Sequence, residues 1–149
     1  MSAETKTFTI SDTTPASAST AVGDVINGLA YFDEVTIHAS LVGATGGTLD
    51  VYLQRKIAAD TWVDWCHFAQ LASGASAVRF TVPMSNPATS ATVAVGIGTD
   101  AAPGVALAAN TFIGGHPGNT VRAVYVAGAS TSAGAAVVIR LACRRRPSA

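Results

Sequence analysis

Apolar and polar residues alternate along most of this chain with a period of two, the pattern of β-strands that bury one face. The alternation is clearest in residues 32–42 and 48–57, which a glycine-rich turn separates. In the first segment the apolar positions are Val35, Ile37, Ala39 and Leu41, and the polar residues Thr36, His38 and Ser40 fall on the opposite face. We therefore predict two consecutive antiparallel strands, each with its apolar side facing a core.

Further segments are predicted as strands. They are residues 5–10, 61–70, 76–84, 92–99, 120–127 and 135–143, and residues 22–29 are predicted as a short strand or a turn. Segment 61–70 is apolar on both faces, and strict alternation places Trp65 on the face opposite Trp62 and Cys66; such a strand is typically covered on both sides. We expect an all-β fold of about eight strands in two antiparallel sheets, a jelly-roll-like sandwich with no substantial helix.

The chain has 149 residues, enough for one domain with its own core. We predict that residues 1–20 form a flexible N-terminal arm with a short edge strand, because the run SDTTPASAST buries too little to order itself. Residues 21–143 would form the sandwich, and residues 144–149 a basic C-terminal tail. No secretory leader is recognisable at the N-terminus.

Charge is scarce. Only 12% of the residues are charged, about half of the roughly 25% typical of soluble domains. The nine basic and nine acidic residues balance, so neither nucleic acid nor a membrane is expected as a partner. Because little charge repulsion separates copies of such a chain, we expect a homo-oligomer, with a dimer favoured over a trimer.

Residues that commonly carry catalysis or bind metals do not form a recognisable site. Cys66 and His67 are adjacent, and adjacent strand residues point to opposite faces, so they do not easily bind one metal. Asp33 and Glu34 are separated in the same way and make a poor glycosidase pair. His116 lies in a tight turn without a nucleophile frame such as GxSxG. We expect no enzymatic activity, no cofactor and no metal.

Two features of the central segment allow more than one interpretation. Its aromatic residues Tyr52, Trp62, Trp65 and Phe68 suit either core packing or a sugar-stacking platform on a sheet. The distant cysteines Cys66 and Cys143 suit two buried thiols, and a disulfide is not implied.

The same segment resembles a known class of proteins. TLDVYLQRKIAADTWVDWCHFAQL, preceded by FDEVTIHASLVGATGG, resembles a pattern in small virion proteins of tailed phages, over residues 32–82. The Ala, Thr, Gly, Ser and Val content of the chain looks like that of capsid decoration, or cement, proteins with a jelly-roll sandwich. The resemblance implies a structural protein that is made in the host cytoplasm, binds the major capsid protein on the outer capsid surface, and carries no catalytic residues.

Such a role needs contact area, so we predict interfaces in residues 1–20, in residues 101–119 and at the basic C-terminus, where arginines would meet an acidic capsid surface. The candidate interface residues are Phe8, Ile10, Trp65, Val105, Leu107, Phe112, Ile113, Arg144, Arg145 and Arg146. The alternative is a tail- or fibre-associated sandwich that binds host carbohydrate, through its aromatic residues, or another virion protein.

Overall fold

The computed structural model describes residues 4–42, 46–59, 61–68, 70–72, 77–83, 97–98, 107–109, 111–113 and 117–145. The strands are β1 (Glu4–Thr13), β2 (Thr20–Asn27), β3 (Glu34–Val42), β4 (Thr48–Ala58), β5 (Thr61–His67), β6 (Leu71–Ala72), β7 (Ala77–Pro83), β8 (Ile97–Gly98), β9 (Thr111–Phe112), β10 (Thr120–Ala127) and β11 (Ala136–Arg145). Within these described residues, the one helical element is the 3-10 turn η1 (Leu29–Tyr31). Most of the segment predicted as a strand in residues 92–99 lies outside the described residues.

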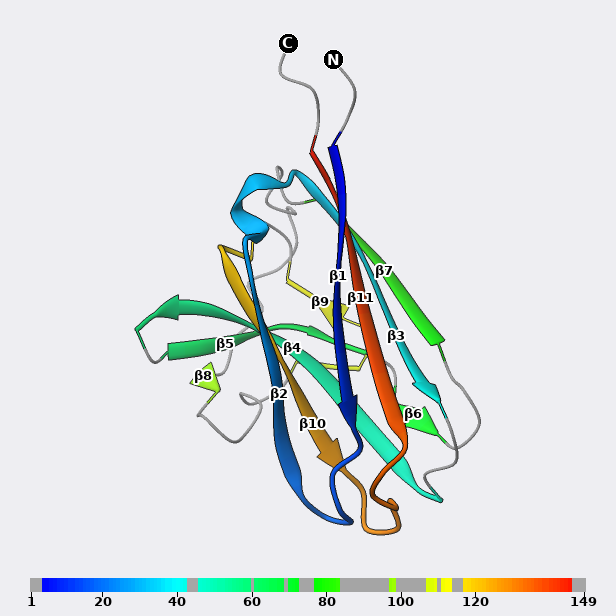
Figure 1. Cartoon of the computed structure of the whole chain (residues 1–149). Helices are drawn as coiled ribbons and strands as arrows, with labels where there is room; N and C mark the ends of the chain where they lie inside the picture. Colours follow the sequence, from blue (N-terminus) through cyan, green and yellow to red (C-terminus); the bar gives the residue numbers. More distant parts are fainter. Residues whose placement is uncertain are drawn as a thin grey trace.

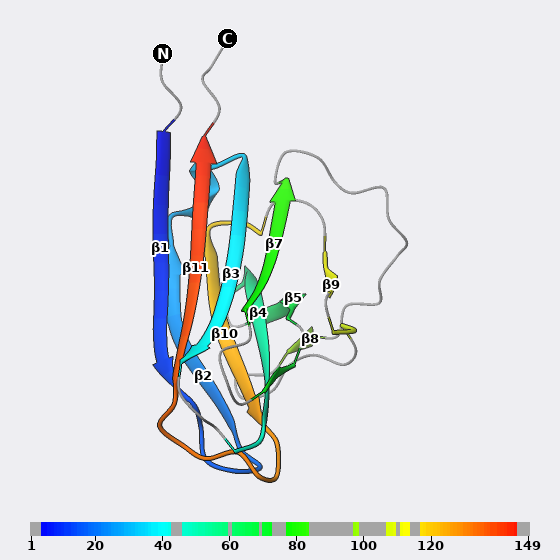
Figure 2. The same ribbon diagram turned by 90° about the vertical axis from the view of Figure 1, so that its right-hand side faces the viewer.

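The strands form two antiparallel sheets that pack face to face (Figures 1 and 2). One has the order β1-β11-β3-β7, and the other has the order β2-β10-β4-β5-β8, with β6 beside β4 and β9 beside β5. The eight longer strands, numbered along the chain, follow the orders 1-8-3-6 and 2-7-4-5. This is the strand order of a jelly roll, so the predicted all-β sandwich is confirmed.

The core lies between the sheets and is filled by alternate residues of the strands. On β3, the predicted inward set is fully buried: Val35, Ile37, Ala39 and Leu41. β11 contributes Val137, Ile139 and Leu141, and β4 contributes Leu49, Val51 and Leu53. The period-two pattern therefore identified these buried faces correctly except at the end of β4, where the same pattern predicts Ile57 inward and the residue is 57% exposed.

The first strand belongs to the sandwich rather than to an arm. β1 pairs with β11 over ten residues, from Glu4 opposite Arg145 to Thr13 opposite Ala136. Its threonines favour extended backbone, and β11 supplies a complete hydrogen-bonding partner. The structure thus differs from the predicted arm: residues 4–13 are a long edge strand. The predicted C-terminal tail, residues 144–149, also overlaps a strand, because β11 extends to Arg145.

The Ser/Thr/Ala/Pro run after β1 is held by hydrogen bonds rather than by apolar burial. Thr14 Oγ1 donates to Ser132 O at 2.9 Å, and Thr14 N donates to Ala135 O at 2.8 Å. Ala18 N donates to Gly128 O at 3.1 Å. These partners lie between β10 and β11, so the distant end of the chain orders a segment whose composition alone suggested disorder.

A bulge in β5 turns Trp65 toward the core. Leu53 of β4 pairs with Cys66 while Gln54 pairs with Asp64, so Trp65 is an extra residue in the ladder. An extra residue interrupts strict alternation. Trp65 and Cys66 therefore both belong to the core cluster and are fully buried. The prediction that they face opposite sides of the sheet is wrong.

A hydrogen bond joins the two sheets at the edge formed by β1 and β2. Tyr125 Oη of β10 donates to Asp12 Oδ2 of β1 at 2.6 Å. This pair passes beside Gly23 of β2, where a Cβ atom would lie 2.8 Å from Tyr125 Cε2 and closer still to Asp12 Oδ2. Glycine at this position leaves the space in which the two sheets connect.

This bond predicts a loss of stability at high pH. Burial, and then the Asp12 carboxylate, raise the pKa of Tyr125. Because the pKa of Tyr125 is higher in the folded state than in the unfolded chain, the protonated side chain stabilises the fold. This stabilisation is complete below about pH 10, the pKa of tyrosine in the unfolded chain, and it is lost as the pH rises further. We expect Tyr125→Phe to lower the free energy of unfolding by about 1.5 to 3 kcal/mol at pH 7, because a hydrogen bond to a charged group is lost.

Urea denaturation at neutral and alkaline pH measures this effect. Tyr125→Phe should show a smaller alkaline loss of stability than the wild-type protein. Tyr31→Phe is the matched control, since the Tyr31 side chain is 71% exposed. Equal stability of Tyr125→Phe and wild type at pH 7 would contradict the assigned role of the bond.

Candidate binding face

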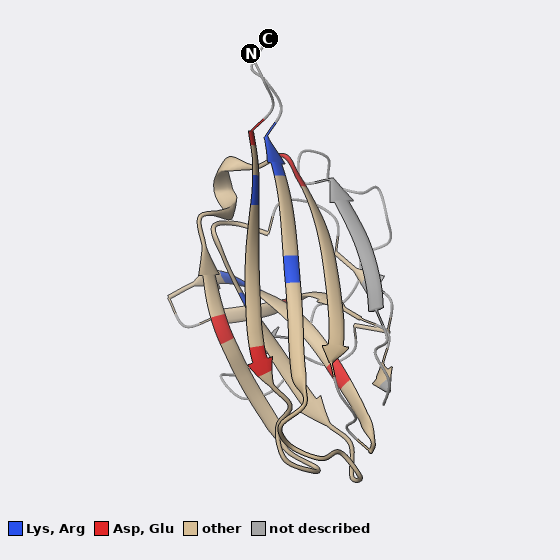
Figure 3. Ribbon diagram, turned by 45° about the vertical axis from the view of Figure 1, so that its right-hand side comes forward, with Lys and Arg blue, Asp and Glu red and all other residues tan. Residues whose placement is uncertain are grey.

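The outward side of the four-stranded sheet presents mostly short side chains, many of which are Thr or Ser. We call thirteen of its outward residues, on three strands, the outer face. They are Thr5, Thr7, Thr9 and Ser11 of β1; Val138, Arg140, Ala142 and Arg144 of β11; and Glu34, Thr36, His38, Ser40 and Val42 of β3. Three of these thirteen are Asp, Glu, Lys or Arg, and Figure 3 shows the charged positions along these strands. The surface is therefore broad and is lined mostly by short, uncharged side chains.

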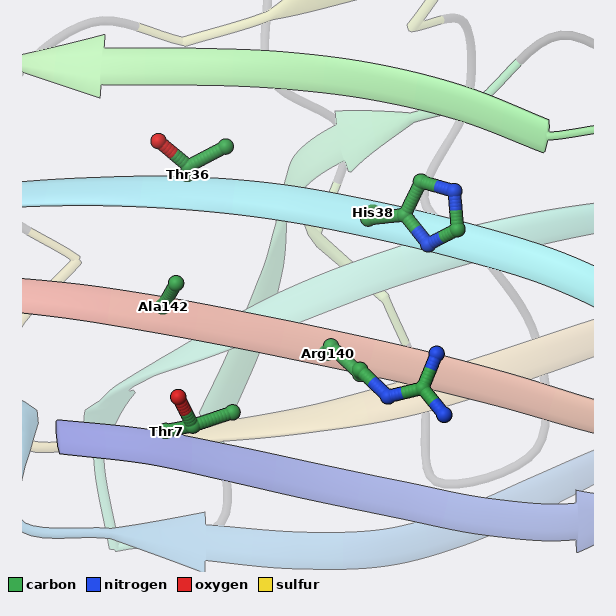
Figure 4. A pocket seen from close by; sticks show the side chains of 5 residues that line it. All are labelled: Thr7, Thr36, His38, Arg140 and Ala142. Carbon is green, nitrogen blue, oxygen red and sulfur yellow. The ribbon is translucent and has the colours of Figure 1, made fainter.

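A shallow hollow of about 500 Å³ lies in the middle of the outer face (Figure 4). Its lining residues are Thr7, Thr36, His38, Arg140 and Ala142. The register explains the hollow: Ala142 lies between Thr7 and Thr36 in one row across the sheet, and Arg140 lies opposite His38 in the next row. Short side chains in one row beside long ones in the next leave a depression.

The two long side chains of this hollow have no partner in the part of the chain that the structure describes. Among the described residues, neither Arg140 nor His38 makes a side-chain hydrogen bond or an ion pair. Arg140 is exposed and His38 is half-buried. The register also places Arg79 of β7 opposite His38. Residues that can carry positive charge thus occupy one row on three neighbouring strands.

The outward side of the other sheet carries a buried polar chain instead. Arg122 Nε donates to Gln54 Oε1 at 2.9 Å, and Gln54 Nε2 donates to Asp64 Oδ1 at 2.9 Å. The guanidinium carbon of Arg122 lies 4.2 Å from the ring centroid of Trp62. All four side chains are buried. We interpret this chain as a brace across β10, β4 and β5, because none of its groups faces solvent.

Each ring nitrogen of His67 lies near an oxygen atom, and none of its contacts among the described residues is a nucleophile. Its Nδ1 lies 2.8 Å from Leu107 O, and its Nε2 lies 3.4 Å from Asp50 Oδ1. The ring stacks on Tyr52 with a centroid separation of 3.9 Å. No hydroxyl or thiol of the described residues hydrogen-bonds to this histidine. The arrangement holds the backbone at Leu107 against β4 and β5.

The two thiols are buried within the described residues, and the described potential metal ligands do not gather into a group of three or more. Cys66 and Cys143 are free and buried. Burial raises the pKa of the Cys66 thiol and raises that of Cys143 to about 12, so both are weak nucleophiles at neutral pH. In the part of the chain that the structure describes, no three His, Cys, Asp or Glu side chains come together to hold a metal ion.

The structure separates the predicted interface residues into three groups. Ile10, Trp65 and Leu107 are buried within the chain. Phe8, Phe112 and Ile113 are partly buried against the core, whereas Arg144 and Arg145 are exposed at the end of β11. Val105 and Arg146 lie outside the described residues. For the buried group, the structure differs from the prediction, because pairing with β11 turns Ile10 inward and the bulge turns Trp65 inward.

The predicted aromatic platform is not on the surface. Trp62 is 7% exposed, and Trp65 and Phe68 are fully buried. Tyr52 stacks on His67 rather than standing free. Trp62, Trp65 and Phe68 thus pack inside the protein and Tyr52 is half-buried, which favours the first of the two interpretations of the aromatic cluster.

Sequence reasoning did not identify Arg140 and His38 as neighbours. The alternation of polar and apolar residues predicts that His38 points outward, and the alternating threonines of β1 predict an outward polar side for that strand too. Pairing between the ends of the chain, which places β1, β11 and β3 side by side, is not visible in any local pattern.

Comparison of the chain with protein-family models, curated proteins and solved structures found no match. Among the described residues, no helix has the length and apolar character needed to cross a membrane. The fold and the outer face define the class of the protein as a jelly-roll β-sandwich with a broad polar face.

Proposed function

We propose that this chain is a structural virion protein that binds the major capsid protein on the outer surface of a tailed-phage capsid and stabilises the lattice without catalysis. The observation that carries the proposal is the outer face. Its Thr, Ser and Ala side chains lose little conformational entropy when a partner covers them, whereas long charged side chains lose much more. A flat sheet of such residues favours docking over a large area.

Two further observations support a capsid as the partner. Residues 32–82 resemble virion proteins of tailed phages, and the jelly-roll strand order is the fold that this resemblance implies. Low charge also suits a protein whose surface is covered in an assembly. The alternative tail or fibre role remains an untested prediction; its proposed sugar contacts, Trp62 and Trp65, are buried.

The edge strand β1 supports a dimer. Its free edge pairs with no strand of the described residues, and unpaired edges associate readily. Antiparallel pairing of two copies centred on Thr9 would place Lys6 of one copy opposite Asp12 of the other. Light scattering should then give twice the 15.0 kDa chain mass, and Lys6→Glu should shift the protein toward the monomer. A monomeric wild-type protein at high concentration would contradict this assembly.

The capsid role is tested on phage particles that carry this gene, compared with particles from which it is deleted. We expect the protein on the heads in many copies, and we expect the deleted particles to release DNA at a lower temperature. Purified protein added back should restore the release temperature. Heads that lack the protein in the wild-type phage, together with unchanged thermal release after deletion, would overturn the proposal.

A further inference from the structure

We propose that the hollow formed by Arg140 and His38 binds the carboxylate of an acidic side chain on the surface of the partner protein. The inference rests on the proposed function for the identity of the partner. The carboxylate-binding property itself belongs to this chain and is tested without the partner. The site differs from the predicted contacts at Arg144 and Arg145, which lie at the end of β11; the third predicted contact, Arg146, lies outside the described residues.

The first step is the uncompensated charge of Arg140. Its guanidinium is exposed and has no ion pair among the described residues. The one acid of the outer face, Glu34, lies opposite Arg144, two rows away. A guanidinium presents paired N–H donors in a plane that matches the two oxygens of a carboxylate.

The second step is the set of groups around that guanidinium. Figure 4 shows Arg140 and His38 side by side on neighbouring strands, with Thr7, Ala142 and Thr36 in the adjoining row. The imidazole of His38 supplies a further donor. Ala142 is too short to block access from solvent. An entering carboxylate would therefore meet donors from two neighbouring strands, β11 and β3.

The third step is the choice of a protein side chain as the ligand. The hollow is about 500 Å³ and opens on a face that carries three charged residues, Glu34, Arg140 and Arg144. Nucleic acid binding needs an extended basic surface, whereas this chain has a formal net charge of zero. A guanidinium and an imidazole side by side, among short side chains, fit a single acidic side chain that docks while the surrounding face covers its neighbours.

Docking would strengthen this contact. Exposed ion pairs contribute little in water, but arginines that become buried at the centre of an interface are frequent hot spots. We expect Arg140→Gln to weaken binding to the partner about tenfold to a hundredfold. The affinity of Arg140→Lys for the partner should lie between those of the wild type and Arg140→Gln, because an ammonium keeps the charge but cannot make two parallel hydrogen bonds to a carboxylate.

The test uses the isolated protein first. N-acetylglutamate amide is titrated into ¹⁵N-labelled protein, with N-acetylglutamine amide as the uncharged matched probe. We expect saturable chemical-shift changes confined to residues 36–40 and 140–142 with the acidic probe only, with a Kd on the order of 10 mM, and their loss in Arg140→Gln. The proposal would be overturned if the acidic probe causes no chemical-shift changes, if the changes persist in Arg140→Gln, or if the uncharged probe produces them as well.

A second measurement separates this inference from the proposed function. Wild type, Arg140→Gln and the control Lys56→Gln, which removes one positive charge from the exposed end of β4, are titrated onto heads that lack the protein. Selective weakening of Arg140→Gln would support the inference, and equal binding of all three would refute the role of the hollow in docking. Failure of the wild type to bind heads would refute the capsid role, while the probe titration still decides whether the hollow binds carboxylates.

Discussion

Replacing Trp65 by alanine is expected to lower the free energy of unfolding by about 3 to 5 kcal/mol, the usual cost of removing a large buried ring. Trp65 is fully buried and heads the group of largest buried side chains. The bulge in β5 holds it in the core beside Cys66. Because single domains are commonly stable by only about 5 to 15 kcal/mol, this variant should be near the limit of folding.

Trp65→Phe is the informative control. The indole Nε1 of Trp65 is buried without a hydrogen-bond partner in the described structure, and an unsatisfied buried donor costs about 1 to 3 kcal/mol. Phenylalanine removes that donor and keeps most of the apolar volume, so it should cost much less than alanine. Urea denaturation followed by far-UV circular dichroism measures both variants. If Trp65→Ala is as stable as wild type, the assignment of Trp65 to the core is wrong.

Replacing Gln54 by leucine is expected to cost about 3 kcal/mol or more. Gln54 is fully buried and links Arg122 to Asp64 through two hydrogen bonds. Hydrogen bonds to charged groups contribute about 1.5 to 3 kcal/mol each. Leucine has a similar size but can bond to neither charge, so both are left buried with fewer partners.

Gln70→Leu is the matched control for this prediction. Gln70 is exposed and donates to Asp50 Oδ2 at 3.1 Å, and exposed substitutions usually change stability by less than about 0.5 kcal/mol. The two variants are compared in the same urea titration. Equal stability of Gln54→Leu and Gln70→Leu would contradict the brace across β10, β4 and β5.

The candidate site could be predicted only in part. Alternation marked His38 and Ser40 as outward residues of one strand, and this agrees with the structure. Arg140 was not identified, because its importance comes from lying opposite His38 on a strand formed by the far end of the chain. Ile10 and Trp65 were predicted as interface residues because they are apolar, but they lie in the core. A sequence does not distinguish these two roles, because an apolar side chain suits both a core and an interface.

The sequence by itself determined the strand character of the chain and the inward set of its regular strands. Val35, Ile37, Ala39 and Leu41 are buried because successive side chains of any strand point to opposite faces, a property of the local backbone. The tertiary structure decided which strands are neighbours, where the bulge at Trp65 falls, and that β1 is an edge strand rather than an arm. These features depend on hydrogen-bonded pairing between segments far apart in the chain, and such pairing leaves no periodic signal in either segment alone.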